Sequence, residues 1–232
     1  PTMTPANPDW RERLASLLRE NRWVIGLELL ILLAIQLLHA FRVIPTTAIF
    51  FVLLGWASLW LRRSGWRNVG LTRPASWGRT IGIALLLAAA FQAISITLIV
   101  PALEWLTQTP LDLSQFAELR SNVPLLLIAF VASWTYAAFV EELAYRGYLM
   151  NRLKDLGGDS RTWWVIAAVV SSVMFGMGHS YQGISGVIET TLSAGMMAAA
   201  YFLGKRNLWL PILVHGFKDT IGFILIFSGL YP

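Results

Sequence analysis

The sequence contains no cysteine among its 232 residues. This absence excludes a disulfide framework, a thiolate metal site and a cysteine nucleophile. Charged residues are also scarce, at 13% of the chain, whereas hydrophobic residues make up 56%. These proportions, with a mean hydropathy of +0.60, lie far from the averages of soluble domains. The composition therefore argues against a soluble protein and predicts an integral membrane protein.

Three sequence patterns are missing as well. No Gly-x-Ser-x-Gly sequence occurs, which argues against a serine nucleophile and an acyl-enzyme. Residues 1–22 are polar, and no small-residue cleavage site follows the first apolar run, so we expect no signal peptide. The strict apolar-polar alternation of a membrane β-barrel is lacking, so the apolar runs should all be helices.

The apolar residues gather in runs of about 20, the length that a helix needs to cross the hydrocarbon core of a bilayer. We expect a polytopic, all-α bundle in one domain, with a juxtamembrane segment over residues 1–22 and a transmembrane domain over 23–232. The seven predicted spans are Trp23–Phe41, Val43–Leu61, Ile81–Leu103, Pro124–Met150, Thr162–His179, Gly186–Gly204 and Leu208–Leu230.

The net charge is +5, and the basic residues lie between the apolar runs. We interpret them as topology signals, not as a nucleic-acid site. Alternate connecting segments hold 15 Lys and Arg on one side of the membrane and 2 on the other, with Lys218 inside a span. This asymmetry predicts a cytoplasmic N-terminus and an external C-terminus. Two basic segments, Arg11–Arg22 and Trp66–Trp77, are either amphipathic helices on the membrane surface or solvated loops.

Ionisable side chains inside apolar spans are costly and mark candidate functional sites. Ten such residues occur here: Glu28, His39, Glu141, Glu142, Arg146, His179, Glu189, His215, Lys218 and Asp219. The fourth span contains Glu141-Glu142 and Arg146. Because Glu142 and Arg146 are four residues apart, they share a helix face and should pair, which leaves Glu141 to point elsewhere.

Two later spans supply imidazole groups. His179 follows Phe175-Gly176-Met177-Gly178, whose glycines permit another backbone to approach closely. His215 and Asp219 lie at i and i+4 on one face, which suits a hydrogen bond, two ligands of one metal or a structural contact. Each group alone has an ordinary structural explanation. Together, on three apolar helices, they predict one shared site.

In their order, these motifs make the sequence resemble the CPBP family, the bacterial relatives of the eukaryotic CAAX prenyl endopeptidase. The family motifs E-E-x-x-x-R, F-x-x-x-H and H-x-x-x-N correspond to Glu141-Glu142 with Arg146, Phe175 with His179, and His215 with Asp219. The resemblance covers about residues 124–230. It implies an intramembrane protease in a bacterial inner membrane, acting on a membrane-associated protein or peptide.

The resemblance also implies residue roles. Glu141 would be the catalytic carboxylate, Glu142 and Arg146 would support the site, His179 would pair with Glu141 around a water, and His215 with residue 219 would stabilise the oxyanion. Position 219 departs from the family in being Asp. An ionised Asp cannot donate a hydrogen bond to an oxyanion, so that role requires a protonated carboxyl.

Two mechanisms and two other classes of function fit the sequence. In one mechanism Glu141 acts as general base without a metal. In the other, a divalent metal such as zinc is held by His179, His215 and a carboxylate, Glu141 or Asp219. The alternatives to an enzyme are a membrane scaffold or immunity protein on the same fold, and a proton-coupled transporter using Glu141, Glu189 and Lys218. We expect the site to lie near mid-depth and to open toward the basic, cytoplasmic side, with the fourth helix extending past the membrane.

Overall fold

The computed structural model describes residues 9–231, and within this range it is a bundle of helices without a strand. The predicted all-α polytopic bundle is confirmed. Five segments are long and apolar enough to cross a membrane: Arg22–Ala40, Trp77–Thr107, Val123–Asp155, Ser180–Leu203 and Trp209–Phe227. The other two predicted spans are shorter apolar helices, α3 (Ala48–Leu61) and α8 (Arg161–Met177).

The complete order of helical segments includes three short 3₁₀ turns (η1, η3, η6) and three π-helical stretches (η2, η4, η5). It is α1 (Trp10–Glu20), α2 (Arg22–Ala40), α3 (Ala48–Leu61), η1 (Trp66–Val69), α4 (Trp77–Ile94), η2 (Ser95–Ile99), α5 (Val100–Thr107), η3 (Ser114–Leu119), α6 (Val123–Ala132), η4 (Ser133–Glu141), η5 (Leu143–Leu149), α7 (Met150–Asp155), α8 (Arg161–Met177), η6 (Ser180–Gln182), α9 (Gly183–Leu203) and α10 (Trp209–Phe227).

Several helices begin at a side-chain cap. Asn21 accepts hydrogen bonds from the first amides of α2, and Ser160 accepts one from Trp163 in α8. Asn122 caps α6, whose second residue is Pro124. These are the residue types that satisfy the free amides of a first helical turn. The polar connections thus set where the apolar helices start.

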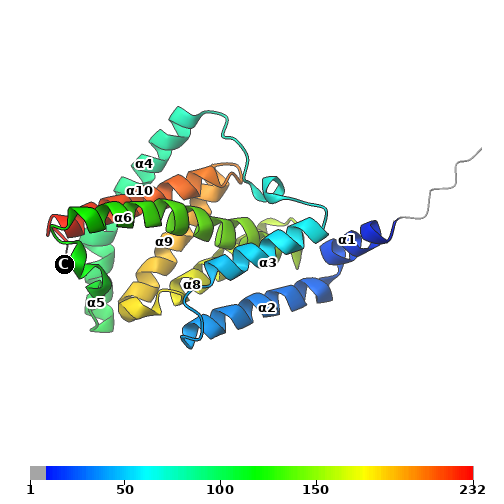
Figure 1. The fold of residues 1–232 in the computed structure, drawn as a ribbon, viewed down its shortest axis with the longest axis horizontal. Helices are drawn as coiled ribbons and strands as arrows, with labels where there is room; N and C mark the ends of the chain where they lie inside the picture. The colour runs from blue at the N-terminus through cyan, green and yellow to red at the C-terminus, as the bar shows by residue number, and fades with distance from the viewer. Residues whose placement is uncertain (1–8, 232) are drawn as a thin grey trace, which may run out of the picture.

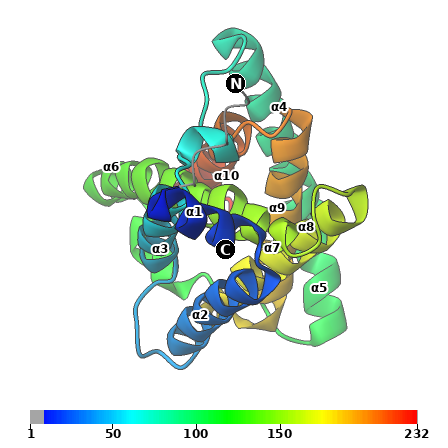
Figure 2. The same ribbon diagram turned by 90° about the vertical axis from the view of Figure 1, so that its right-hand side faces the viewer.

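One long helical segment runs through the middle of the molecule in both ribbon views (Figures 1 and 2). It consists of α6, η4, η5 and α7 and has 33 residues. At 1.5 Å per residue it is about 50 Å long, well over the length needed to cross a bilayer. This length agrees with the expectation of a long fourth helix. Glu141 and Glu142 lie where its two π-helical stretches meet.

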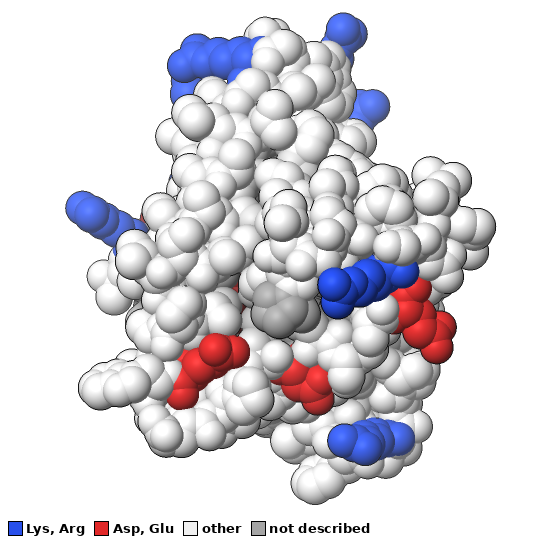
Figure 3. All heavy atoms as spheres, turned by 90° about the vertical axis from the view of Figure 1, so that its left-hand side faces the viewer, with Lys and Arg blue, Asp and Glu red and all other residues white. Residues whose placement is uncertain are grey.

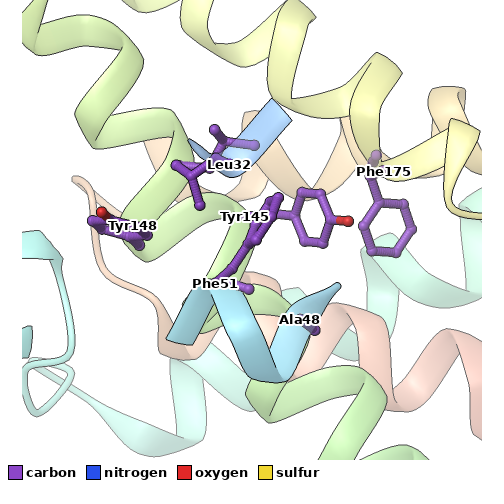
Figure 4. Close-up of a cluster of buried hydrophobic side chains, with 9 residues drawn as sticks. Leu32, Ala48, Phe51, Tyr145, Tyr148 and Phe175 are labelled. Atoms are coloured by element: carbon purple, nitrogen blue, oxygen red, sulfur yellow. The ribbon is translucent and has the colours of Figure 1, made fainter. Parts of the chain in front are cut away.

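The first hairpin encloses part of this central helix. Leu32 of α2 and Phe51 of α3 join Tyr145 and Tyr148 of η5 in one buried cluster, which Figure 4 shows. The contact is close because α3 carries Gly55: a Cβ there would come within 2.7 Å of the Tyr148 ring. The central helix therefore packs against both α2 and α3, which with their connection form the first hairpin.

Large apolar side chains remain exposed over much of the surface, among them Trp23 (88%) and Leu98 (64%). Such extensive apolar exposure fits a surface that faces lipid. Of the two segments considered as amphipathic helices, the first forms α1. The second does not form one helix: η1 is a single turn that ends at Gly70, whose φ of 107° is left-handed, and α4 begins only at Trp77. Residues 1–8 of the predicted juxtamembrane segment lie outside the described residues.

Candidate active site

The four residues predicted to form the site line one cavity of about 350 Å³: Glu141, His179, His215 and Asp219. They come from the central helix, the end of α8 and the middle of α10. The rest of the lining mixes apolar side chains with serine, tyrosine and glutamine. The structure therefore brings the residues of three separate motifs to one cavity, as the sequence predicted.

Glu142 is the centre of a buried polar cluster behind this cavity. Its Oε1 accepts a hydrogen bond from Arg146 at 2.9 Å and lies 2.9 Å from Nδ1 of His215. Arg146 also donates to the carbonyl of Ala194 in α9 at 2.8 Å, and its guanidinium stacks 4.9 Å from the Phe175 ring. The predicted pairing of Glu142 with Arg146 is confirmed, and this pair joins the central helix to α8, α9 and α10.

Glu141 lines the larger cavity. Its Oε2 is buried and has no hydrogen-bond partner. Most buried polar atoms in proteins are hydrogen-bonded, so an unpaired carboxylate oxygen that faces a cavity is a functional candidate. The sequence-based expectation that Glu141 lacks the local partner taken by Glu142 agrees with this geometry.

His179 lies just beyond the end of α8, where the chain turns into η6. Its Nδ1 is 3.0 Å from the carbonyl of Phe175, which leaves Nε2 free of that contact. Gly176 allows α8 to approach α9: an added Cβ would lie 1.9 Å from Oγ1 of Thr191 and 2.6 Å from the carbonyl oxygen of Val187. The predicted role of glycine beside this histidine is thus explained by close helix contact.

His215 and Asp219 face each other along α10, with Nε2 of His215 at 3.7 Å from Oδ2 of Asp219. The same carboxylate oxygen accepts a hydrogen bond from Ser133 of η4 at 2.8 Å. Gly216 brings α10 against the central helix, because a Cβ there would be 2.6 Å from the Trp134 ring. Asp219 therefore serves as a hydrogen-bond acceptor for Ser133.

A second cavity, of about 280 Å³, lies against the same catalytic candidates. Glu141, His179, Tyr136, Phe175 and Tyr181 line both cavities. The rest of the wall comes from residues 39 and 45–47 of the first hairpin, together with Tyr145 and Gly178. Glu141 and His179 thus lie where two chambers meet, which would allow a chain to be held on both sides of them.

The direction in which the larger cavity extends differs from the prediction. Its lining includes Leu111, Phe116, Tyr181 and Tyr231, which lie in the connecting segments at the end opposite to α1. Figure 3 looks onto this end, where most of the surface is uncharged and acidic and basic side chains are scattered. The expected opening toward the basic side is therefore wrong.

The physical reason is that the basic end is filled with packed side chains. There Arg152 is fully buried and forms an ion pair of 2.5 Å with Glu28, which also accepts a hydrogen bond from Tyr148. Arg62 reaches Asp155 at 3.2 Å in the same network. Glu28, one of the ionisable residues singled out in the sequence, belongs to this structural network and not to the candidate site.

Two further residues singled out in the sequence also line the larger cavity. Glu189 accepts hydrogen bonds from Ser95 at 2.8 Å and Ser193 at 3.1 Å, and Lys218 lies 3.5 Å from the same oxygen. The charges of Glu189 and Lys218 therefore compensate each other. This pair is separate from the cluster around Glu142, although both border one cavity.

The residues present do not form a ready metal site. Among residues 9–231, no group of three or more His, Asp or Glu side chains is placed to hold a metal ion. Nδ1 of His215 is engaged by Glu142, and the oxygen of Asp219 nearest to this ring is bonded to Ser133. The predicted ligand set of His179, His215 and a carboxylate is thus not assembled among these residues.

Sequence reasoning missed several members of the site. The bond between Glu142 and His215 joins residues 73 positions apart and has no local signal. Ser133 and Tyr136 are polar residues in an otherwise apolar run, and that contrast is the signal that could have identified them. His39 appeared among the ionisable residues but received no role.

Comparison with protein families matches residues 123–221 to the family described as type II CAAX prenyl endopeptidase Rce1-like. Neither the curated proteins nor the solved structures give a match. The matched segment contains Glu141, Glu142, Arg146, His179, His215 and Asp219. The five long apolar helices make the chain an integral membrane protein, and its residues 123–221 are similar to the CAAX protease family.

Proposed function

We propose that the chain is an intramembrane endopeptidase in which Glu141 activates a water molecule for attack on a peptide bond. The observation that carries this proposal is the buried, unpartnered carboxylate oxygen of Glu141 at the junction of two cavities, beside His179. A general base needs access to its water and no competing partner, and this position offers both.

The proposed reaction is the hydrolysis of a peptide bond by one water molecule. Glu141 takes a proton from a water that His179 helps to hold, and the water oxygen attacks the carbonyl carbon of the peptide bond. The resulting tetrahedral oxyanion accepts a hydrogen bond, and Glu141 then gives its proton to the leaving nitrogen as the carbon–nitrogen bond breaks. The products are a carboxylic acid and an amine, and transfer of the acid's proton to the amine leaves a carboxylate and an ammonium group.

The oxyanion donor in this proposal is Nε2 of His215. Because Nδ1 faces the carboxylate of Glu142 at 2.9 Å, this nitrogen serves as the donor to Glu142. Donation from Nε2 then requires a proton on both ring nitrogens. Asp219, 3.7 Å from Nε2 and held by Ser133, would support that protonated ring. We therefore assign Asp219 to the positioning of His215 and not to direct donation.

A purified sample in lipid vesicles, given a fluorogenic peptide with an apolar membrane anchor, tests the function. We expect Glu141→Gln and His179→Ala each to abolish cleavage while the melting temperature stays near that of the wild type. Glu20→Gln, at an exposed position in α1, serves as the matched control and should cleave normally. Near-normal cleavage by Glu141→Gln would refute the assignment. Absence of cleavage by the wild type across a peptide panel would favour the scaffold, or a transporter built on the pair of Glu189 and Lys218.

We further propose that the segments with most of the Lys and Arg face the cytoplasm of a bacterial cell. The two cavities would then extend toward the outer leaflet, since their connecting segments lie at the opposite end. The substrate would be a membrane-associated protein or peptide, presented from that leaflet.

A further inference from the structure

His39 lies in the last turn of α2 and reaches across to the segment that carries His179. Its Nε2 is 3.1 Å from the carbonyl oxygen of Gly178, and its Nδ1 is 3.1 Å from the carbonyl oxygen of Ile44. The side chain also lines the smaller cavity together with Glu141 and His179. His39 lies outside residues 123–221, so the family match does not include it.

The two contacts place different demands on the ring. Both partners are backbone carbonyls, which only accept hydrogen bonds, whereas a neutral imidazole has one donor and one acceptor. Only the ring with a proton on both nitrogens satisfies both carbonyls.

We propose that His39 is a positioning residue for His179. With both ring nitrogens protonated, it donates to the carbonyls of Gly178 and Ile44 and so fastens the segment before His179 to the connection between α2 and α3. When the ring has only one proton, one of the two carbonyls faces a ring lone pair. One hydrogen bond between His39 and the backbone is then lost, and the segment before His179 is held less firmly. The expected effect of His39 on the rate of cleavage rests on the proposed function. Its contact with the segment before His179 does not.

The residues around His39 are also hydrogen-bonded to one another and form one polar wall of the smaller cavity. Gln36, one turn earlier on α2, accepts a hydrogen bond from Tyr145 at 3.3 Å, and Tyr145 bonds to Thr47 at 2.7 Å. Gly178 lies next to this wall, since a Cβ there would be in ordinary van der Waals contact, at 3.8 Å, with both Nε2 of Gln36 and the Tyr145 hydroxyl. The first hairpin thus contributes several polar groups beside Glu141 and His179.

Other groups that titrate or carry charge lie near His39 and must be separated from it in any pH experiment. They are Glu141 and Tyr136 on η4, Tyr145 on η5, His179 and Tyr181 around η6, and Arg42 three residues further along the chain. Because all of them remain in a variant of residue 39, a comparison of wild type with that variant isolates the contribution of His39.

The test uses His39→Phe, which keeps an aromatic ring without donors, and His39→Gln, which keeps one donor group. Cleavage is measured from pH 5.5 to 8.5, the range in which histidine changes its charge. We expect His39→Phe to lower kcat on the order of tenfold at pH 6, because small displacements of catalytic groups slow catalysis. The ratio of wild-type to variant kcat should fall as the pH rises. A purely packing role would give a ratio that does not depend on pH. Leu38→Ala, next to His39 but 43% exposed, serves as the control and should leave the ratio near one.

Hydrogen exchange provides a second readout that does not need catalysis. After correction for the intrinsic rate, amides 176–182 of the wild type should be better protected at pH 6 than at pH 8, and this difference should vanish in His39→Phe. His39→Gln should be intermediate, and it replaces His39→Phe if that variant does not fold. Equal protection in wild type and variants at both pH values would overturn the role of His39. If the wild type cleaves no peptide, the proposed function fails, but the exchange result still decides whether His39 holds this segment.

Discussion

The buried pair of Glu142 and Arg146 allows a strong prediction for Glu142→Ala. The side chains of Arg146 and Glu142 are 1% and 0% exposed, so the variant leaves a guanidinium inside the bundle with only the Ala194 carbonyl as its polar partner. Breaking one partner of such a pair costs about 3–5 kcal/mol. The loss should be at the upper end of this range, because His215 also loses its acceptor.

The assay is thermal unfolding of detergent-solubilised protein. The readout is the fraction of protein that stays monodisperse after heating to each temperature. For a chain of this size the loss corresponds to a melting temperature lower by about 10–20 °C. Glu142→Leu combined with Arg146→Leu removes both charges and should recover most of the stability. The charge swap should recover less, since it brings an arginine against His215.

An exposed ion pair provides the control. Glu12 bonds to Arg19 at 2.7 Å, and both side chains are about 40% exposed. Glu12→Ala should therefore leave the melting temperature almost unchanged. If Glu142→Ala were as stable as Glu12→Ala, or if the double leucine variant were no better than Glu142→Ala, the reasoning from burial would be refuted.

Three further predictions concern other parts of the bundle. Glu28→Ala should lower the melting temperature without changing the activity of the folded fraction, because it leaves buried Arg152 without its closest partner; reduced activity per folded molecule would contradict this structural role. Gly176→Ala should destabilise the protein by about 1–3 kcal/mol, because its methyl would meet a threonine oxygen at 1.9 Å; an unchanged melting temperature would show that α8 and α9 separate easily. Because the chain has no cysteine, single cysteines at Ser64 and Ser228 can be labelled in intact cells with an impermeant maleimide, and we expect labelling at Ser228 alone; the reverse pattern would invert the proposed orientation.

The helices were predictable because bilayer thickness sets the length of an apolar run. Each predicted span corresponds to a helix, although α3 and α8 are short. The pairing of Glu142 with Arg146 was predictable for a similar reason, since spacing along one helix fixes it. For Trp66–Trp77 the sequence left an amphipathic helix and a loop open, and Gly70 decides between them because its left-handed conformation ends the turn.

Relations between helices were harder to predict. The bond of Glu142 to His215 depends on how α10 packs on the central helix, and no spacing in the sequence encodes that contact. The cavity extends toward the end of the bundle that packed side chains leave open. The basic end is closed by the network of Arg152 and Glu28. Counting residues along a span gives the depth of a side chain but not this packing.

The two chambers that meet at Glu141 and His179 have a consequence for the supply of water. A cavity with only 10–15 Å³ of space for a water-sized probe is about the smallest that holds one molecule, and these chambers offer about 280 and 350 Å³. Both also have polar groups in their walls. Each chamber can thus hold several water molecules. Hydrolysis inside the apolar bundle would then draw on a local reservoir, and the slow event to look for is the threading of a peptide between the chambers.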